Sequence, residues 1–129
     1  MESLISLKEE EIDKETLNII ITGCIHGSLD KMYKDIKEYS STSNKKIDMI
    51  LCTGDFECMR TEKDLTFLSC PEKYREMGDF YKYYTSKAIA PSLTIFIGGN
   101  HEASNYLEQN YEIFKEIKSK IKLDSEITT

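Results

Sequence analysis

The chain is poor in the residues that build metal-binding ribbons and disulfide-rich scaffolds. It has only two histidines, and its four cysteines form no Cys-x-x-Cys pair. The missing cysteine pairs argue against a zinc ribbon and against a small fold held together by disulfides. With so few imidazoles, any metal site has to take further ligands from carboxylate, amide or thiolate groups.

Long apolar runs and clusters of basic residues are also lacking. No apolar stretch approaches the ~20 residues of a membrane span, and residues 1–15 lack the basic start and apolar middle of a signal peptide. The net charge is −6, and −4 of it falls on residues 1–15 through six acidic and two basic side chains. We expect a soluble intracellular protein with an acidic leader over residues 1–16, no membrane association and no strong nonspecific binding of nucleic acid.

What the sequence does contain is a repeated pattern, in which a short apolar run ends at glycine and polar residues follow. Three segments share it: Leu17–Thr22 before Gly23-Cys24-Ile25-His26, Ile47–Thr53 before Gly54-Asp55, and Leu93–Ile97 before Gly98-Gly99-Asn100-His101-Glu102. Continuous β-branched apolar runs are typical of strands in a sheet that is covered on both faces. The pattern therefore predicts three such strands.

Helical periodicity fills the spaces between these strands. After the first strand, four apolar residues fall on one helical face: Leu29, Met32, Tyr33 and Ile36. Ser28 is placed to cap this helix, and a polar loop over residues 40–46 is expected to end it. A crossover of this length between two strands forms a right-handed βαβ unit, so the sequence predicts an α/β fold with a parallel sheet.

The rest of the chain is expected to be helical in three places. Glu62–Leu68 has the composition of a helical turn or two, and Pro71 can begin the next helix. After the last strand, regularly spaced apolar residues predict an amphipathic helix from Leu107 to Ile121.

The three strand ends predict one site, because the carboxyl ends of parallel strands meet at the same edge of a sheet. His26 and Asp55 offer a nitrogen and an oxygen ligand of the kind that divalent first-row metals accept, and Asp55 can bridge two ions. The Asn100 side-chain oxygen can complete the ligand set of a second ion. A Cys24 thiolate ligand would favour zinc or iron over magnesium. His101 is a candidate acid for a leaving oxygen.

Each of these residues also has a plainer explanation. A single Gly-Asp after a strand is commonly a turn or a helix cap, and Cys24 alone suits a small buried apolar position. His26 alone could simply bond to the backbone. The tetrad Gly99-Asn100-His101-Glu102 is harder to explain in this way, because these residues serve no core.

An aromatic segment lies between the second and third strands. Its rings are Tyr74, Phe80, Tyr81, Tyr83 and Tyr84. We expect most of them to pack in the core or against the sheet. The alternative for one or two exposed tyrosines is stacking on nucleic-acid bases.

Asp-x-His, Gly-Asp and Gly-Asn-His-Glu in this order resemble the signature of the calcineurin-like metallophosphoesterases, with Cys24 in place of the first aspartate. With a cysteine at this position, the sequence resembles the RNA lariat-debranching enzymes within this superfamily. Further stretches that resemble this group are Gly27-Ser28-Leu29-Asp30-Lys31-Met32-Tyr33, Cys52-Thr53-Gly54-Asp55-Phe56-Glu57, Pro71-Glu72-Lys73-Tyr74-Arg75-Glu76-Met77, Phe80-Tyr81-Lys82-Tyr83-Tyr84 and Glu102-Ala103-Ser104-Asn105.

The resemblance implies metal-dependent hydrolysis of the 2′,5′-phosphodiester bond at the branch point of excised introns, and therefore a nuclear protein with branched RNA as partner. It implies manganese, iron or zinc, as one or two ions, held by Cys24, His26, Asp55 and Asn100. It implies that His101 assists the leaving 2′-oxygen. The implied organisation is an N-terminal half-domain over residues 17–107, followed by a divergent helix and tail over 108–129.

The sequence departs from the family after residue 107, because no histidine follows His101. The family uses later histidines as further ligands, so we expect weak metal binding, an uncovered sheet face and poor catalysis by this chain alone. One alternative is a non-catalytic remnant that binds RNA, or a protein partner through the Leu107–Ile121 helix. Another is a metallophosphoesterase for a different phosphoester, against which Cys24 and the tyrosine-rich segment argue.

Overall fold

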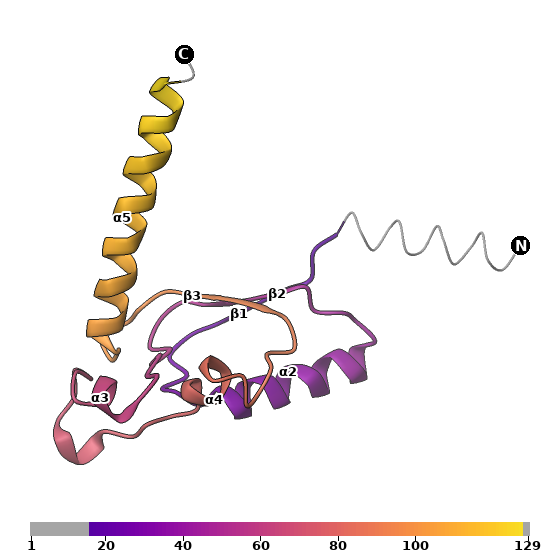
Figure 1. The fold of residues 1–129 in the computed structure, drawn as a ribbon. Coiled ribbons are helices and arrows are strands. Elements are labelled where there is room, and N and C mark those ends of the chain that lie inside the picture. Colours follow the sequence, from indigo (N-terminus) through magenta and orange to yellow (C-terminus); the bar gives the residue numbers. More distant parts are fainter. Residues whose placement is uncertain (1–15, 128–129) are drawn as a thin grey trace, which may run out of the picture.

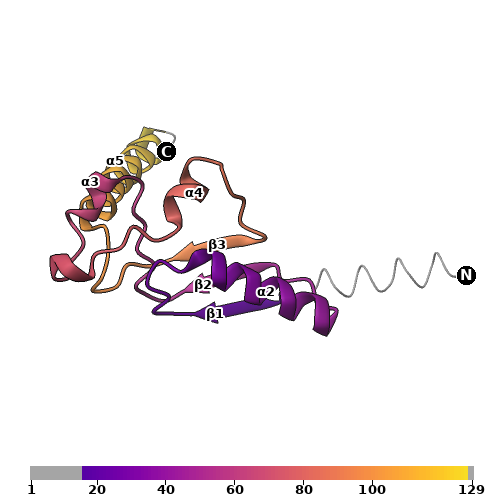
Figure 2. The same cartoon turned by 90° about the horizontal axis from the view of Figure 1, so that it is seen from below.

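Three short parallel strands form the centre of the molecule. The computed structural model describes residues 16–127, with only the backbone described at positions 114, 118 and 120–127. The strands are β1 (Ile19–Thr22), β2 (Met49–Cys52) and β3 (Leu93–Phe96), paired in the order β1-β2-β3. In Figure 2 they lie side by side, with their carboxyl ends directed toward one set of loops. The predicted strands, their parallel pairing and the α/β class are confirmed. The predicted acidic leader lies outside the described residues except for residue 16.

The crossover from β1 to β2 is helix α2 (Leu29–Ser43), which buries Leu29, Met32, Tyr33 and Ile36 as predicted. The predicted end of this helix was wrong, because the polar residues 40–43 are helical. The hydroxyl groups of Thr42 and Ser43 donate to backbone carbonyls one turn earlier, at 3.0 and 2.6 Å, and Asn44 ends the helix in the left-handed conformation. Ser28 precedes the helix, but its side chain makes no capping hydrogen bond.

Short helical pieces connect β2 to β3. They are α3 (Glu62–Leu65), the 3-10 turn η1 (Glu72–Tyr74) directly after Pro71, and α4 (Phe80–Tyr84). Phe80 packs edge-on against both Phe56 and Phe96, whose rings are stacked at 3.9 Å. Of the five rings in the aromatic segment, Phe80 and Tyr83 are half-buried and pack against the core, whereas Tyr74 and Tyr84 are exposed. The expectation that most of these rings pack in the core or against the sheet therefore holds for Phe80 and Tyr83 only.

Helix α5 (Ser104–Ile127) is longer at both ends than the predicted Leu107–Ile121 segment, and it projects away from the sheet (Figure 1). Its first turn is fastened to α3 through Asp64, which accepts hydrogen bonds from Arg60 Nε at 2.7 Å and from Asn105 Nδ2 at 2.7 Å. The Arg60 guanidinium also lies 4.0 Å from the centre of the Tyr106 ring. Within the described part of the chain, no helix combines the length and apolar character needed to cross a bilayer.

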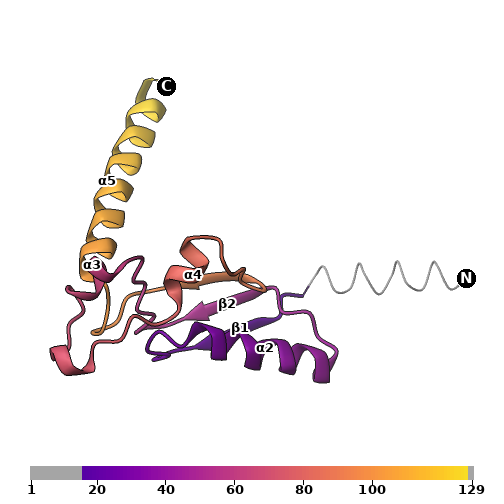
Figure 3. The same ribbon diagram turned by 60° about the horizontal axis from the view of Figure 1, so that its bottom comes forward.

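The two faces of the sheet are covered unequally. In Figures 1 and 3, α2 and α4 lie on the same side of the strands. The central residue Ile50 is fully buried on that side. Four exposed side chains belong to the edge strands: Ile19, Ile21, Leu93 and Ile95. Among the described residues the expectation of a sheet covered on both faces is therefore wrong, whereas the uncovered face expected from the family comparison is present.

A matched pair of substitutions tests this asymmetry. Ile50→Ala is expected to lower the free energy of unfolding by about 2–4 kcal/mol, because it leaves a cavity in a packed core. Ile21→Ala, on the neighbouring strand, is expected to change it by less than about 0.5 kcal/mol, since Ile21 is 70% exposed. Urea denaturation followed by circular dichroism measures both, and equal losses would show that the outer face is covered in solution.

Candidate functional site

The loops that follow β1 and β2 have an unusual backbone. Cys24, His26, Asp55 and Glu57 all have positive φ angles, of 52°, 46°, 47° and 58°. A non-glycine residue in this region costs of order 1–3 kcal/mol and persists where the surrounding structure holds it. Here the two loops hold each other, because Cys24 N donates to Gly54 O and His26 N donates to Asp55 O, both at 3.0 Å.

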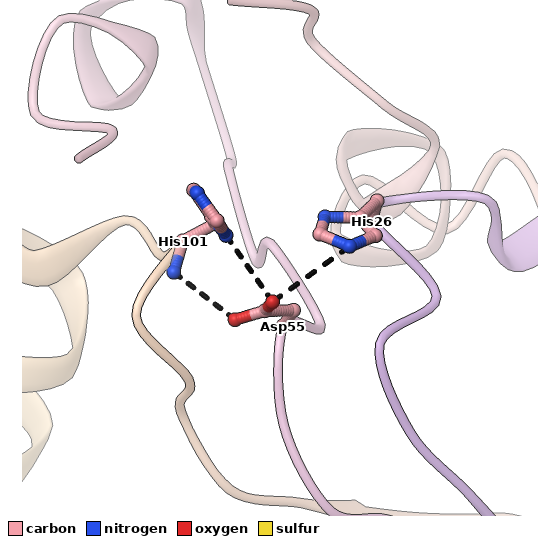
Figure 4. Close-up of side chains that lie close together, drawn as sticks. All are labelled: His26, Asp55 and His101. Carbon is pink, nitrogen blue, oxygen red and sulfur yellow. Dashed lines mark hydrogen bonds and ion pairs between the residues drawn. The ribbon is translucent and has the colours of Figure 1, made fainter. Parts of the chain in front are cut away.

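Asp55 is the centre of the polar cluster at this edge of the sheet (Figure 4). Its Oδ1 accepts a hydrogen bond from the His101 backbone N–H at 3.0 Å, and its Oδ2 lies 3.2 Å from His101 Nδ1. His26 Nε2 approaches the same Oδ2 from the other side at 3.8 Å. The His101 backbone N–H, followed by the His101 ring, lowers the pKa of Asp55 despite the burial of its carboxyl group. The carboxylate is therefore ionised at neutral pH.

Gly99 lets the loop after β3 reach Asp55. A Cβ atom added to Gly99 would overlap both the carboxyl group and the backbone nitrogen of Asp55. Because only glycine leaves this space free, the Gly98-Gly99 pair that the sequence shows after β3 has a steric reason at its second position. The close approach brings His101 into hydrogen-bonding distance of Asp55.

Glu102 holds the loop after β2 in place through hydrogen bonds to the loop backbone. Its buried carboxylate accepts backbone hydrogen bonds from Phe56, Glu57 and Cys58 at 2.5, 2.9 and 3.3 Å. A longer one, of 3.4 Å, comes from Gly99 within its own loop. In the sequence, Glu102 is part of the polar tetrad, and no role was predicted for it. The structure shows that it joins the loop that carries His101 to the loop that carries Asp55.

Glu57 is a further buried carboxylate beside Asp55 and Glu102, and it was not predicted from the sequence as a site residue. Its Oε1 lies 3.2 Å from His26 Nδ1, on the side of the imidazole ring that faces away from Asp55. Burial raises the pKa of Glu57, while the hydrogen bond with His26 acts in the opposite direction. The available sequence signal was an acidic residue two positions after Asp55.

The side chains of His26, Asp55 and His101 offer ligand atoms that all lie within 4.8 Å of one another. Among the described residues, the ion pairs of Asp55 and Glu57 are with histidines, and none joins a lysine or arginine to Asp55, Glu57 or Glu102. Buried carboxylates are normally paired or bound to metal. Metal–ligand bonds of about 2.0–2.2 Å allow one ion to contact both His26 Nε2 and Asp55 Oδ2, which are 3.8 Å apart. The donor set and its spacing thus fit a divalent first-row metal.

The structure brings together three of the five predicted site residues: His26, Asp55 and His101. Cys24 lies at the same edge through its backbone, but its side chain is exposed and outside this group. Asn100 is exposed beside His101. The ligand roles of Cys24 and Asn100 therefore stay predictions. His101, predicted as an acid, lies in the same cluster as the predicted ligands.

A pocket of about 290 Å³ opens beside the two histidines. Its lining residues are His26, Glu57, Leu68, Cys70, Pro71, Tyr74, Glu76 and His101. The Tyr74 side chain is 65% exposed, which leaves its aromatic ring accessible to a ligand in this pocket. A group bound at the polar cluster could therefore extend toward an aromatic surface.

Comparison with known proteins agrees with this geometry. Residues 17–127 match the family described as calcineurin-like phosphoesterase. The chain is 55% identical over 95 residues to the lariat debranching enzyme of Arabidopsis thaliana, which covers 74% of this chain and 23% of that protein. It is 52% identical over 93 residues to lariat debranching enzyme A of Xenopus laevis, covering 72% of this chain and 17% of that protein.

The lariat debranching enzyme of Entamoeba histolytica is 49% identical over 94 residues, which cover 73% of this chain and 27% of that protein. The matched part of the chain thus spans between 17% and 27% of the length of these three relatives.

Proposed function

Because the chain belongs to the calcineurin-like phosphoesterase family, we propose that it acts on branched RNA and hydrolyses the 2′,5′-phosphodiester bond at the branch point of lariats. One observation carries the proposal: loops from three strands bring His26, Asp55 and His101 together at one edge of the sheet. The names of the relatives, at about half identity over some 95 residues, supply the substrate.

Calcineurin-like phosphoesterases use divalent metals, and His26 and Asp55, in the group that they form with His101, can hold one. The proposal is narrower, namely manganese, iron or zinc as one or two ions, because nitrogen and carboxylate donors suit first-row metals. When bound, the metal supplies positive charge to the scissile phosphate and to the oxygens on either side of it. A second ion would take Cys24 and Asn100 as ligands.

Beside the metal, Asp55, His101 and Tyr74 each have a separate role in the proposed reaction. Asp55 accepts the Nδ1 proton of His101 and fixes the orientation of the imidazole ring. The Nε2 atom of His101 then faces away from Asp55, so that an imidazolium at this position can protonate the leaving 2′-oxygen. The neighbouring pocket offers Tyr74 for stacking on a base next to the branch, an interaction worth about 1–3 kcal/mol.

Cleavage of a 2′,5′-branched RNA oligonucleotide by the 129-residue chain tests the proposal, with a linear RNA of the same sequence as the control substrate. We expect slow cleavage of the branched RNA only, dependent on added manganese, iron or zinc. His101→Ala is expected to lower the rate at least about 100-fold, because a general acid contributes 10²–10⁴-fold. Equal cleavage of branched and linear RNA, or an unchanged rate in His101→Ala, would contradict the proposal.

A second candidate function is binding without catalysis, and the observation that favours it is the exposed apolar surface of α5. Tyr111 and Ile117 are more than half exposed on a helix that extends from the sheet. A folded chain that binds metal and branched RNA but cleaves nothing would support this alternative, with α5 as the site for a protein partner. Since lariats arise in splicing, both candidates carry the further proposal of a nuclear location.

A further inference from the structure

The two nitrogen atoms of the His26 ring face two different carboxylates. Nδ1 lies 3.2 Å from Glu57 Oε1, which is within hydrogen-bonding distance, and Nε2 lies 3.8 Å from Asp55 Oδ2, which is beyond it. A neutral imidazole carries one proton, so the nitrogen that has a hydrogen-bond acceptor keeps it. The lone pair then remains on Nε2, on the side of Asp55.

We propose that Glu57 is a positioning residue that keeps the proton of His26 on Nδ1 and thereby directs the Nε2 lone pair toward the cation held with Asp55. The inference rests on the proposed metal site and adds Glu57 to it as a residue that acts through His26. A carboxylate behind a metal-binding histidine fixes both the tautomer and the orientation of the ring.

Glu57 is well held for this role. Its backbone N–H donates to Glu102 Oε2 at 2.9 Å, and its side chain is buried. On the other side of the carboxylate, the backbone of Gly27 comes so close that an added Cβ would lie 3.2 Å from Glu57 Oε2. The Gly27 backbone and the hydrogen bond to Glu102 thus restrict the movement of Glu57 on two sides.

A direct ligand role for Glu57 fits the geometry less well. The atoms that converge within 4.8 Å come from His26, Asp55 and His101, and Glu57 is outside this group. The groups that face the His26 ring are thus Glu57 behind it, and Asp55 and His101 in front of it, with the two imidazole centres 5.4 Å apart. Glu57 reaches the site through the His26 ring.

The test compares the wild-type chain with Glu57→Gln, Glu57→Ala and the control Glu72→Ala, which removes an exposed acid on η1. Nitrogen-15 NMR of the imidazole rings, recorded without metal at a pH where His26 is neutral, identifies the protonated nitrogen. Zinc titration measures affinity in the same samples. We expect an Nδ1–H tautomer in the wild type and in Glu57→Gln, whose amide oxygen can still accept the hydrogen bond. In Glu57→Ala we expect a shift toward Nε2–H and a 10–100-fold loss of zinc affinity.

Several results would overturn the inference. They are an Nε2–H tautomer in the wild type, an unchanged tautomer in Glu57→Ala, or equal losses of zinc affinity in Glu57→Gln and Glu57→Ala. If Glu57→Ala does not fold, the wild-type tautomer and the Glu57→Gln affinity decide the question. The expected tautomers in a chain that cleaves no branched RNA would overturn the proposed function and leave the role of Glu57 supported.

Discussion

Replacing Asp55 by alanine is expected to lower the affinity for a divalent metal by more than about 100-fold, because loss of an outer partner alone costs 10–100-fold and Asp55 is a direct donor. It is also the residue that the other two site residues share, since His101 bonds to both of its oxygens and His26 faces one of them. The same substitution is expected to abolish cleavage of branched RNA. Titration with zinc or manganese measures the affinity, and the RNA assay measures the rate.

Asp55→Asn removes the negative charge of the side chain but keeps its shape. The amide oxygen can still accept the His101 backbone N–H, so this variant is expected to fold like the wild type, yet its NH₂ group would replace the oxygen that faces both imidazoles. Asp35→Asn, on the exposed surface of α2, is the control for loss of one negative charge. A metal affinity within threefold of the wild type in Asp55→Asn would show that Asp55 is not a ligand.

Glu102→Ala is expected to reduce the free energy of unfolding by about 4–6 kcal/mol, since a buried group that loses its hydrogen-bond partner costs about 1–3 kcal/mol. The carboxylate accepts bonds from four backbone N–H groups, and alanine would leave all four without this partner. A domain has a total stability of about 5–15 kcal/mol, so the variant is expected to be partly unfolded at 25 °C. Urea denaturation measures the loss.

Glu102→Gln tests the same contact without a cavity. Both carboxylate oxygens are acceptors, so a glutamine would turn an NH₂ group toward backbone N–H donors at one of the two positions. We expect a loss of about 2–4 kcal/mol, against less than about 0.5 kcal/mol for Glu108→Gln on the exposed side of α5. A Glu102→Gln variant as stable as the wild type would contradict the role of Glu102 as an ionised acceptor.

The sequence was informative wherever one local pattern decided the structure. Apolar runs that end at glycine predicted the three strands and the meeting of His26, Asp55 and His101, because parallel pairing sends every strand end to one edge. The four-residue apolar face of α2 predicted which side of the helix is buried.

Contacts between distant loops could not be predicted in this way. Glu57 and Glu102 are ordinary acids in the sequence, and their roles depend on backbone conformations such as φ 58° at Glu57 and on partners more than 30 positions away. The extension of α2 through Ser43 has a different, local cause, because the hydroxyl groups of Thr42 and Ser43 bond back to the helix instead of ending it.

The strand order β1-β2-β3, identical to the order in the sequence, has a consequence for biosynthesis. A chain that leaves the ribosome at about 5–20 residues per second exposes its N-terminal segments first. Strands β2 and β3 each pair with the strand made before them, so none of the three described strands has to be inserted between two others. His26, Asp55 and His101 emerge one per strand, and translation can therefore assemble the cluster stepwise, with Glu102 closing it directly after its last member has been made.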